Sequence, residues 1–66
     1  MTRQVRENWI VNIENATSFI ASEIGNETVG FVLEKYGAET IDEIADCDLS
    51  DVFNELDAIE AEIRSD

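Results

Sequence analysis

The sequence predicts an all-α fold, a small compact bundle of three main helices plus one short helix. Apolar residues recur every three or four positions along most of the chain, and no strand-like alternation extends over a useful length. Two glycines, Gly25 and Gly37, stand where helices should end. With 66 residues and no proline, the chain has room for one hydrophobic core, so residues 1–66 should form a single helical domain.

The first predicted helix runs from about Arg3 to Ile24. Its apolar residues fall on one stripe of a helix, and they are Val5, Trp9, Ile13, Ala16, Ile20 and Ile24. Gly25 suits the left-handed conformation that often ends a helix, and Asn26 is a favourable N-cap for the next one. A tight turn is therefore expected between the two helices.

The second predicted helix begins near Glu27 and ends at Gly37. Its apolar residues follow the spacing of a buried helix face, and they are Val29, Val32, Leu33 and Tyr36. Lys35 lies in the last turn, where a cation interacts favourably with the helix dipole. Glycine inside a helix costs about 1 kcal/mol relative to alanine. Gly30 therefore predicts that another helix packs closely over this position.

The remaining segment predicts one short helix and one long helix. The sequence from Thr40 to Glu43 matches a capping box, so a short helix should begin there, with buried residues at Ile41, Ile44 and Ala45. Asp48 or Ser50 should cap the final helix. The predicted buried face of that helix comprises Leu49, Val52, Phe53, Leu56, Ile59 and Ile63.

The chain carries no apolar run long enough for targeting or membrane insertion. The longest runs, Trp9 to Val11 and Phe31 to Leu33, are far shorter than the ~20 residues of a membrane span, so a cytoplasmic location is expected. A single cysteine cannot form an internal disulfide, and packing alone rarely supplies more than ~3–5 kcal/mol in so short a chain. Dimerisation is therefore one option. Val11, Phe19 and Phe31 lie off the main apolar stripes and could form its seam, unless the core encloses them.

Negative charge dominates the composition. Sixteen acidic residues, four basic residues and no histidine give a formal net charge of −12. This charge argues against direct contact with nucleic acid or an anionic membrane and favours a basic protein partner. The acids are densest from Glu39 to Glu62, a segment that contains no base. The residues expected to bind the partner are Asp48, Asp51, Glu55, Glu60 and Glu62.

Three explanations of this charge are open on the sequence alone. The carboxylates could only keep a small apolar core soluble. They could instead reproduce the charge spacing of a nucleic-acid backbone and occupy a basic groove of a nucleic-acid-binding protein. They could also dock to a basic protein without any mimicry.

Neither catalysis nor a cofactor is expected. The usual general base is missing because the chain has no histidine, and Asp46 and Asp48 disfavour the thiolate form of Cys47. The chain is also too small to offer a substrate cleft to paired carboxylates. We therefore predict no catalytic, cofactor or metal site.

Two ligand-binding patterns are approached but not met. Asp46, Asp48 and Ser50 resemble the start of a calcium loop of the EF-hand type, but Asp51 replaces its glycine and Asp57 its final glutamate. Ser50 is also the only candidate for the serine that carries phosphopantetheine in acyl carrier proteins. In those proteins the serine directly follows an aspartate and precedes a leucine, which is not the case here.

Three segments carry a resemblance to a group of known proteins: Glu7 to Ile10, Tyr36 to Ala38, and Val52 to Glu60. Through them the chain resembles short acidic uncharacterised proteins encoded in mobile genetic elements of Gram-positive bacteria, over most of its length. The resemblance implies no enzyme activity and favours an accessory or counter-defence role. It identifies no functional residues.

The function predicted from the sequence is that of a non-enzymatic acidic interaction module. It would present the carboxylates between Glu39 and Glu62 to a basic protein surface, either as a nucleic-acid mimic or by simple docking. The alternative is a purely structural homodimer, or a subunit of a larger assembly, without charge mimicry.

Overall fold

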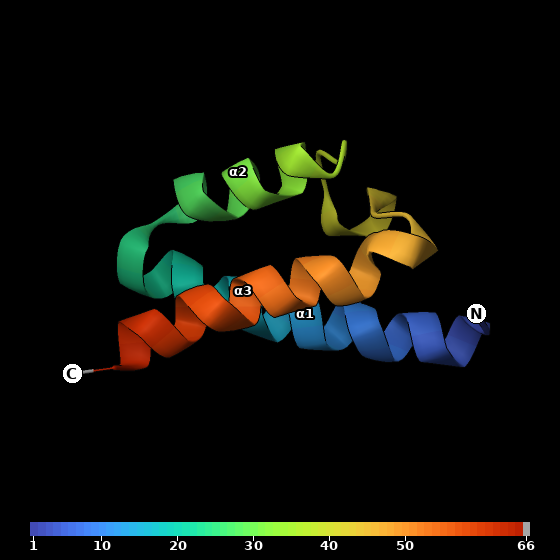
Figure 1. Cartoon of the computed structure of the whole chain (residues 1–66), viewed down its shortest axis with the longest axis horizontal. Helices are drawn as coiled ribbons and strands as arrows, with labels where there is room; N and C mark the ends of the chain where they lie inside the picture. The colour runs from blue at the N-terminus through green and yellow to red at the C-terminus, as the bar shows by residue number, and fades with distance from the viewer. Residues whose placement is uncertain (66) are drawn as a thin grey trace.

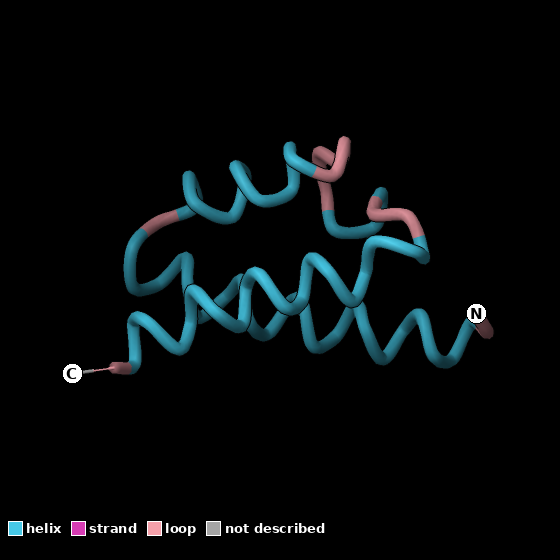
Figure 2. The backbone as a smooth tube through the Cα atoms, viewed as in Figure 1, coloured by secondary structure: helices cyan, strands magenta, loops and turns pink. Residues whose placement is uncertain are grey.

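The computed structural model describes residues 1–65 and confirms the all-α class. The elements are α1 (Arg3–Ile24), α2 (Asn26–Lys35), the 3-10 turns η1 (Ile41–Glu43) and η2 (Asp46–Asp48), and α3 (Leu49–Arg64). No β-strand occurs in these residues, and none of their helices is long and apolar enough to cross a membrane. α1 and α3 run side by side in the same direction, whereas α2 runs back in the opposite direction (Figure 1). Short loops separate the elements (Figure 2).

The boundaries of α1 are those that the apolar stripe predicts. The Thr2 hydroxyl accepts a hydrogen bond from the backbone N–H of Val5 at 3.2 Å and so caps the first turn. Gly25 ends the helix with a φ of +94°, and its N–H donates to the carbonyl of Ala21 at 3.0 Å. The prediction of Asn26 as the next N-cap is wrong, because Gly25 itself holds that position and Asn26 is already helical.

The end of α2 is a Schellman motif, which is the standard closure of a helix by glycine. The N–H of Ala38 donates to the carbonyl of Leu33 at 3.1 Å, and the N–H of Gly37 donates to that of Glu34 at 3.0 Å. Ala38 and Leu33 are both buried, as the hydrophobic contact of this motif requires. The prediction about Gly30 is wrong: among residues 1–65, no atom outside its immediate surroundings lies within 4 Å of the position that a Cβ would take.

The predicted short helix is a pair of single 3-10 turns. The Glu43 carboxylate accepts hydrogen bonds from the N–H groups of Glu39 and Thr40, each at 3.1 Å, which completes its part of the capping box. Ile44 then adopts an extended conformation, so the turn does not continue. Ile44 is buried as predicted, but Ala45 is exposed because this extended stretch turns it to solvent.

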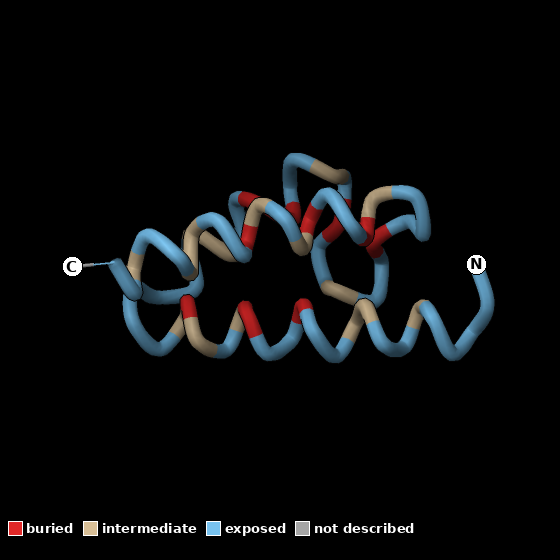
Figure 3. The backbone as a smooth tube through the Cα atoms, turned by 60° about the horizontal axis from the view of Figure 1, so that its bottom comes forward, coloured by how far each residue is buried: buried red, intermediate tan, exposed pale blue. Residues whose placement is uncertain are grey.

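The core lies between the facing stripes of α1 and α3 and the buried face of α2, and the chain between α2 and α3 covers one end of it (Figure 3). Edge-to-face packing of Trp9 against Phe53, with ring centroids 5.7 Å apart, extends the core along α1. Val5 and Ile24 continue the apolar stripe of α1 but are exposed, so the stripe is longer than its buried part at both ends. The buried apolar residues are Ile13, Ala16, Ile20, Val32, Leu33, Ala38, Ile44, Leu49, Val52 and Leu56.

Candidate interaction surfaces

Four of the five predicted partner-binding residues share one flank of α3. Asp51, Glu55 and Glu62 are separated by intervals of four and seven residues, which return to the same face of a helix. Asp48 stands one turn before Asp51 at the helix start. Glu60 is two residues from Glu62, which places it on the opposite flank, roughly 200° away around the helix axis. We call the set Asp48, Asp51, Glu55 and Glu62 the acidic flank.

An ion pair with α2 neutralises the centre of the acidic flank. The Lys35 ammonium donates a hydrogen bond to Oε1 of Glu55, and both side chains are partly exposed. This bond, with a smaller contribution from the Tyr36 hydroxyl, lowers the pKa of Glu55 from its ordinary 4.5. Its stabilising effect is therefore present above about pH 4.5 and is lost as the pH falls further.

Tyr36 shows that the acidic flank faces the end of α2. The hydrogen bond of its hydroxyl to Glu55, its partial burial, and the negative charges of Glu55, Asp51 and Asp48 raise its pKa to about 12. The phenol at the end of α2 therefore lies within electrostatic reach of three acidic residues from the first half of α3 and its N-cap. The raised pKa favours the folded state below about pH 10, and this contribution is lost as the pH rises towards about 12.

We expect the only tyrosine of the chain to ionise at unusually high pH. In an ultraviolet absorbance titration of the folded protein, Tyr36 should titrate near pH 12. Glu55→Gln should bring the midpoint towards the ordinary 10.0, because it removes the carboxylate whose hydrogen bond and charge both raise the pKa of Tyr36. Asp57→Asn, at an exposed α3 position that does not perturb Tyr36, is the matched control and should leave the midpoint in place. A wild-type midpoint near 10.0 would contradict the described contact.

Glu60 is occupied by a separate contact on the other flank. Arg64 lies one turn further along α3, with its Nε 3.6 Å from Oε2 of Glu60. The guanidinium of Arg64 also lies over the ring of Phe19 on α1, 4.1 Å from the ring centroid. This cluster of an aromatic ring, an arginine and a glutamate ties the end of α3 to α1.

The remaining two basic side chains are also paired. Arg6 bonds Asp46 through Nη1 and the carbonyl of Asp42 through Nη2, the latter at 2.8 Å, and thereby attaches the 3-10 turns to α1. Arg3 pairs with Glu7 one turn along α1 at 3.4 Å. All four lysine and arginine side chains of the chain are thus engaged with an acid.

Most acids of the described residues have no ion-pair partner. The acidic residues within residues 1–65 that form no ion pair are Glu14, Glu23, Glu27, Glu34, Glu39, Asp42, Glu43, Asp48, Asp51, Asp57 and Glu62. The ion pairs lie at least partly in solvent, where such pairs contribute only about 0–1 kcal/mol each. The surface is therefore strongly negative, and its positive groups are held in contacts within the molecule.

A second acidic surface lies on α2, outside the predicted set. A shallow groove is lined by Glu27, Gly30, Phe31, Glu34, Ala38 and Glu39. Phe31 is 68% exposed, the highest value among the large apolar residues. The sequence does indicate that part of this surface lies on one helix face, because the first four of these residues follow the spacing i, i+3, i+4, i+7. We call these six residues the Phe31 groove.

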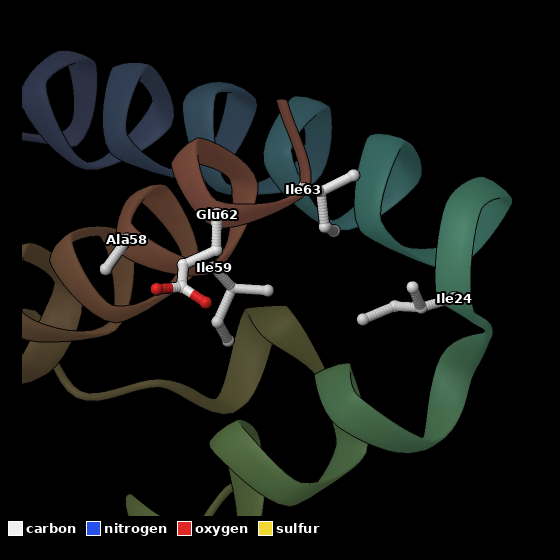
Figure 4. Close-up of a pocket in the computed structure, with 5 residues that line it drawn as sticks. All are labelled: Ile24, Ala58, Ile59, Glu62 and Ile63. Carbon is white, nitrogen blue, oxygen red and sulfur yellow. The ribbon is translucent and has the colours of Figure 1, made fainter. Parts of the chain in front are cut away.

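An apolar groove lies at the end of the bundle where α1 and α3 finish. It is lined by Ile24, Ala58, Ile59, Glu62 and Ile63, and Figure 4 shows the side chains of Ile24 and Ile59 on opposite sides of it. Glu62 of the acidic flank stands at its rim. Only one carboxylate borders this groove, so it is the more apolar of the two.

The remaining residues weighed for chemistry do not form a common site. Cys47 is exposed, and its sulfur lies 3.9 Å from a carboxylate oxygen of Asp48. Ser50 is exposed in the first turn of α3, and within residues 1–65 no three acidic or cysteine side chains converge on a point where a metal ion would fit. No protein-family model, curated protein or solved structure matches the chain.

Proposed function

We propose that this chain is a non-enzymatic interaction module that binds a basic protein surface. The observation that carries the proposal is a difference between the basic and the acidic side chains. Every lysine and arginine forms an ion pair within the molecule, whereas most acids in residues 1–65 have no ion-pair partner. A surface of this kind attracts cationic partners over a distance of about one Debye length and repels anionic ones.

The acidic flank is the part of α3 that suits this role. Asp51 and Glu62 are exposed and have no ion-pair partner, and Asp48 lies beside them at the helix start. Glu55 can contribute after exchanging Lys35 for a partner's cation, whereas Glu60 is directed away and is engaged by Arg64. A basic surface that crosses α3 would therefore meet Asp48, Asp51 and Glu62 first.

In its finer form, the proposal takes the partner to be a nucleic-acid-binding protein whose basic groove the carboxylates occupy. Carboxylates repeated along a rigid helix present negative charge at regular intervals, as a phosphate backbone does. The resemblance to proteins of mobile genetic elements agrees with this form, since an accessory protein of this size can act by blocking such a groove. Competition by duplex DNA would support mimicry over simple docking.

A homodimer remains the second candidate because two of the three predicted seam residues stay exposed. Val11 is 53% exposed and Phe31 is 68% exposed. They line different grooves, and Phe19 lies under Arg64, so the three residues do not form one continuous seam. Sedimentation at two concentrations separates the candidates, because a dimer gives a mass that rises with concentration.

Retention of basic proteins on the immobilised chain tests the proposal. Proteins from a bacterial lysate that are eluted by rising salt should be strongly basic. The variant Asp51→Lys/Glu62→Lys should lose them, whereas Glu14→Lys/Glu23→Lys, with the same change in net charge on exposed positions of α1, should keep most of them. Circular dichroism checks that both variants stay helical. Equal retention by the two variants would contradict a site on the acidic flank.

A further inference from the structure

We propose that the Phe31 groove is a docking site for an arginine carried by a helical segment of the basic partner. The inference rests on the proposed function and specifies a second contact surface, its occupant and the chemistry of recognition. It starts from a comparison of two phenylalanines within the same molecule.

Phe19 and Phe31 differ in burial and in their cationic contacts. Phe19 is partly buried against the core, whereas Phe31 is 68% exposed. Phe19 carries a guanidinium over its ring, 4.1 Å from the centroid, and that guanidinium also pairs with Glu60. Phe31 lies between Glu27 and Glu34, one turn away on either side, and the three residues line one groove. No basic side chain belongs to that groove. The ring and the carboxylates of an arginine site are therefore present on α2, and the arginine is missing.

Charge selects the occupant of the groove. Three carboxylates border Phe31, and a guanidinium satisfies both features at once, because it stacks on an aromatic face and donates paired hydrogen bonds to carboxylates. A second copy of this chain is a poor occupant, because a two-fold contact would bring the same acidic rim against itself. The net charge of −12 adds long-range repulsion between copies.

Gly30 has no side chain, so the backbone of a partner helix can approach α2 closely at this point of the groove. Gly30 lies in the interior of α2, where glycine costs stability. Within residues 1–65, nothing outside its immediate surroundings lies within 4 Å of the position that an added Cβ would take. The close helix approach that the sequence predicted at this position is not made within the chain. A partner helix would supply it and would bring its arginine over the neighbouring ring of Phe31.

The test uses two helical alanine-based peptides that differ only in carrying arginine or lysine at every fourth position. Binding is followed by fluorescence polarisation of a label on the peptide. Wild-type protein should bind the arginine peptide roughly two- to fivefold more tightly than the lysine peptide, the fold-change expected from an exposed cation–π contact. Phe31→Leu keeps an apolar side chain but removes the aromatic face, so it should abolish this preference while still binding both peptides.

Gly30→Ala gives an independent readout with opposite effects on stability and binding. The added methyl enters open space, so the helix gains stability and the thermal midpoint should rise by several degrees. The same methyl raises the floor of the groove, so affinity for the arginine peptide should fall. Val11→Ala, at an exposed position outside the Phe31 groove, should leave the affinity unchanged.

The outcomes separate this inference from the proposed function. Equal binding of the two peptides by wild-type protein, unaffected by Phe31→Leu, would overturn the arginine site and leave a general acidic module. Failure of both peptides to bind at low salt would overturn the proposed function as well. A mass that doubles with concentration in wild-type protein but not in Phe31→Leu would make a second copy the occupant and would also overturn the arginine site.

Discussion

Leu56→Ala is expected to leave the chain largely unfolded at room temperature. Leu56 is fully buried on α3 within the core cluster. Removing a leucine from such a site costs about 2–5 kcal/mol, because transfer free energy is lost and the cavity closes only in part. In a chain of this length, packing alone rarely supplies more than about 3–5 kcal/mol of stability in total. The loss is therefore comparable to the whole free energy of unfolding.

Circular dichroism during urea and thermal unfolding measures this effect. The matched control is Val11→Ala, which removes apolar atoms from a side chain that is 53% exposed and should change stability only slightly. A cooperative Leu56→Ala transition within a few degrees of wild type would mean that α3 does not depend on this contact. Stability that increases with protein concentration would show that association supplies the missing free energy.

Local features of the sequence were enough to predict the main helices. The ends of α1 follow from a continuous apolar stripe and from Gly25, and the end of α2 follows from Gly37. The register of the α3 face was also correct, because Leu49, Val52 and Leu56 are all buried. These signals concern neighbouring residues on one helix, where spacing alone determines which side chains share a face.

The errors arose where distant contacts decide the conformation. The segment from Ile41 to Asp48 has a helix-start signal, but its two short turns are attached to α1 through Arg6. The first turn ends at the extended residue Ile44, and the second leads directly into α3. Ala45 was misplaced for this reason. A glycine inside a helical pattern predicts close packing, but the pattern cannot distinguish a close contact from an open position, and Gly30 is open.

For the candidate surfaces too, local spacing predicts which residues share a face, whereas distant contacts decide which charges are paired. Spacing places Asp51, Glu55 and Glu62 on one flank, but only the packing of α2 shows that Lys35 neutralises Glu55. Likewise, Arg64 contacts Phe19 across two helices that are far apart in the sequence. Such pairs determine which carboxylates remain available to a partner, and no count of charges along the chain reveals them.

Gly25→Ala is expected to destabilise the fold by about 1–3 kcal/mol, the cost of holding an L-residue in a region that only glycine readily adopts. Gly25 has φ +94° and ψ 171° and is the only residue between α1 and α2, so the hairpin cannot relax the strain without moving α2. No atom beyond its neighbours lies within 4 Å of the new Cβ, so the cost comes from the backbone and not from a clash. Gly30→Ala is the matched control, because it adds the same methyl in open space within α2. Alanine is the better helix former, so the urea midpoint of Gly30→Ala should be higher than that of wild type, whereas the urea midpoint of Gly25→Ala should be lower. Midpoints that shift in the same direction would contradict the described conformation of the turn.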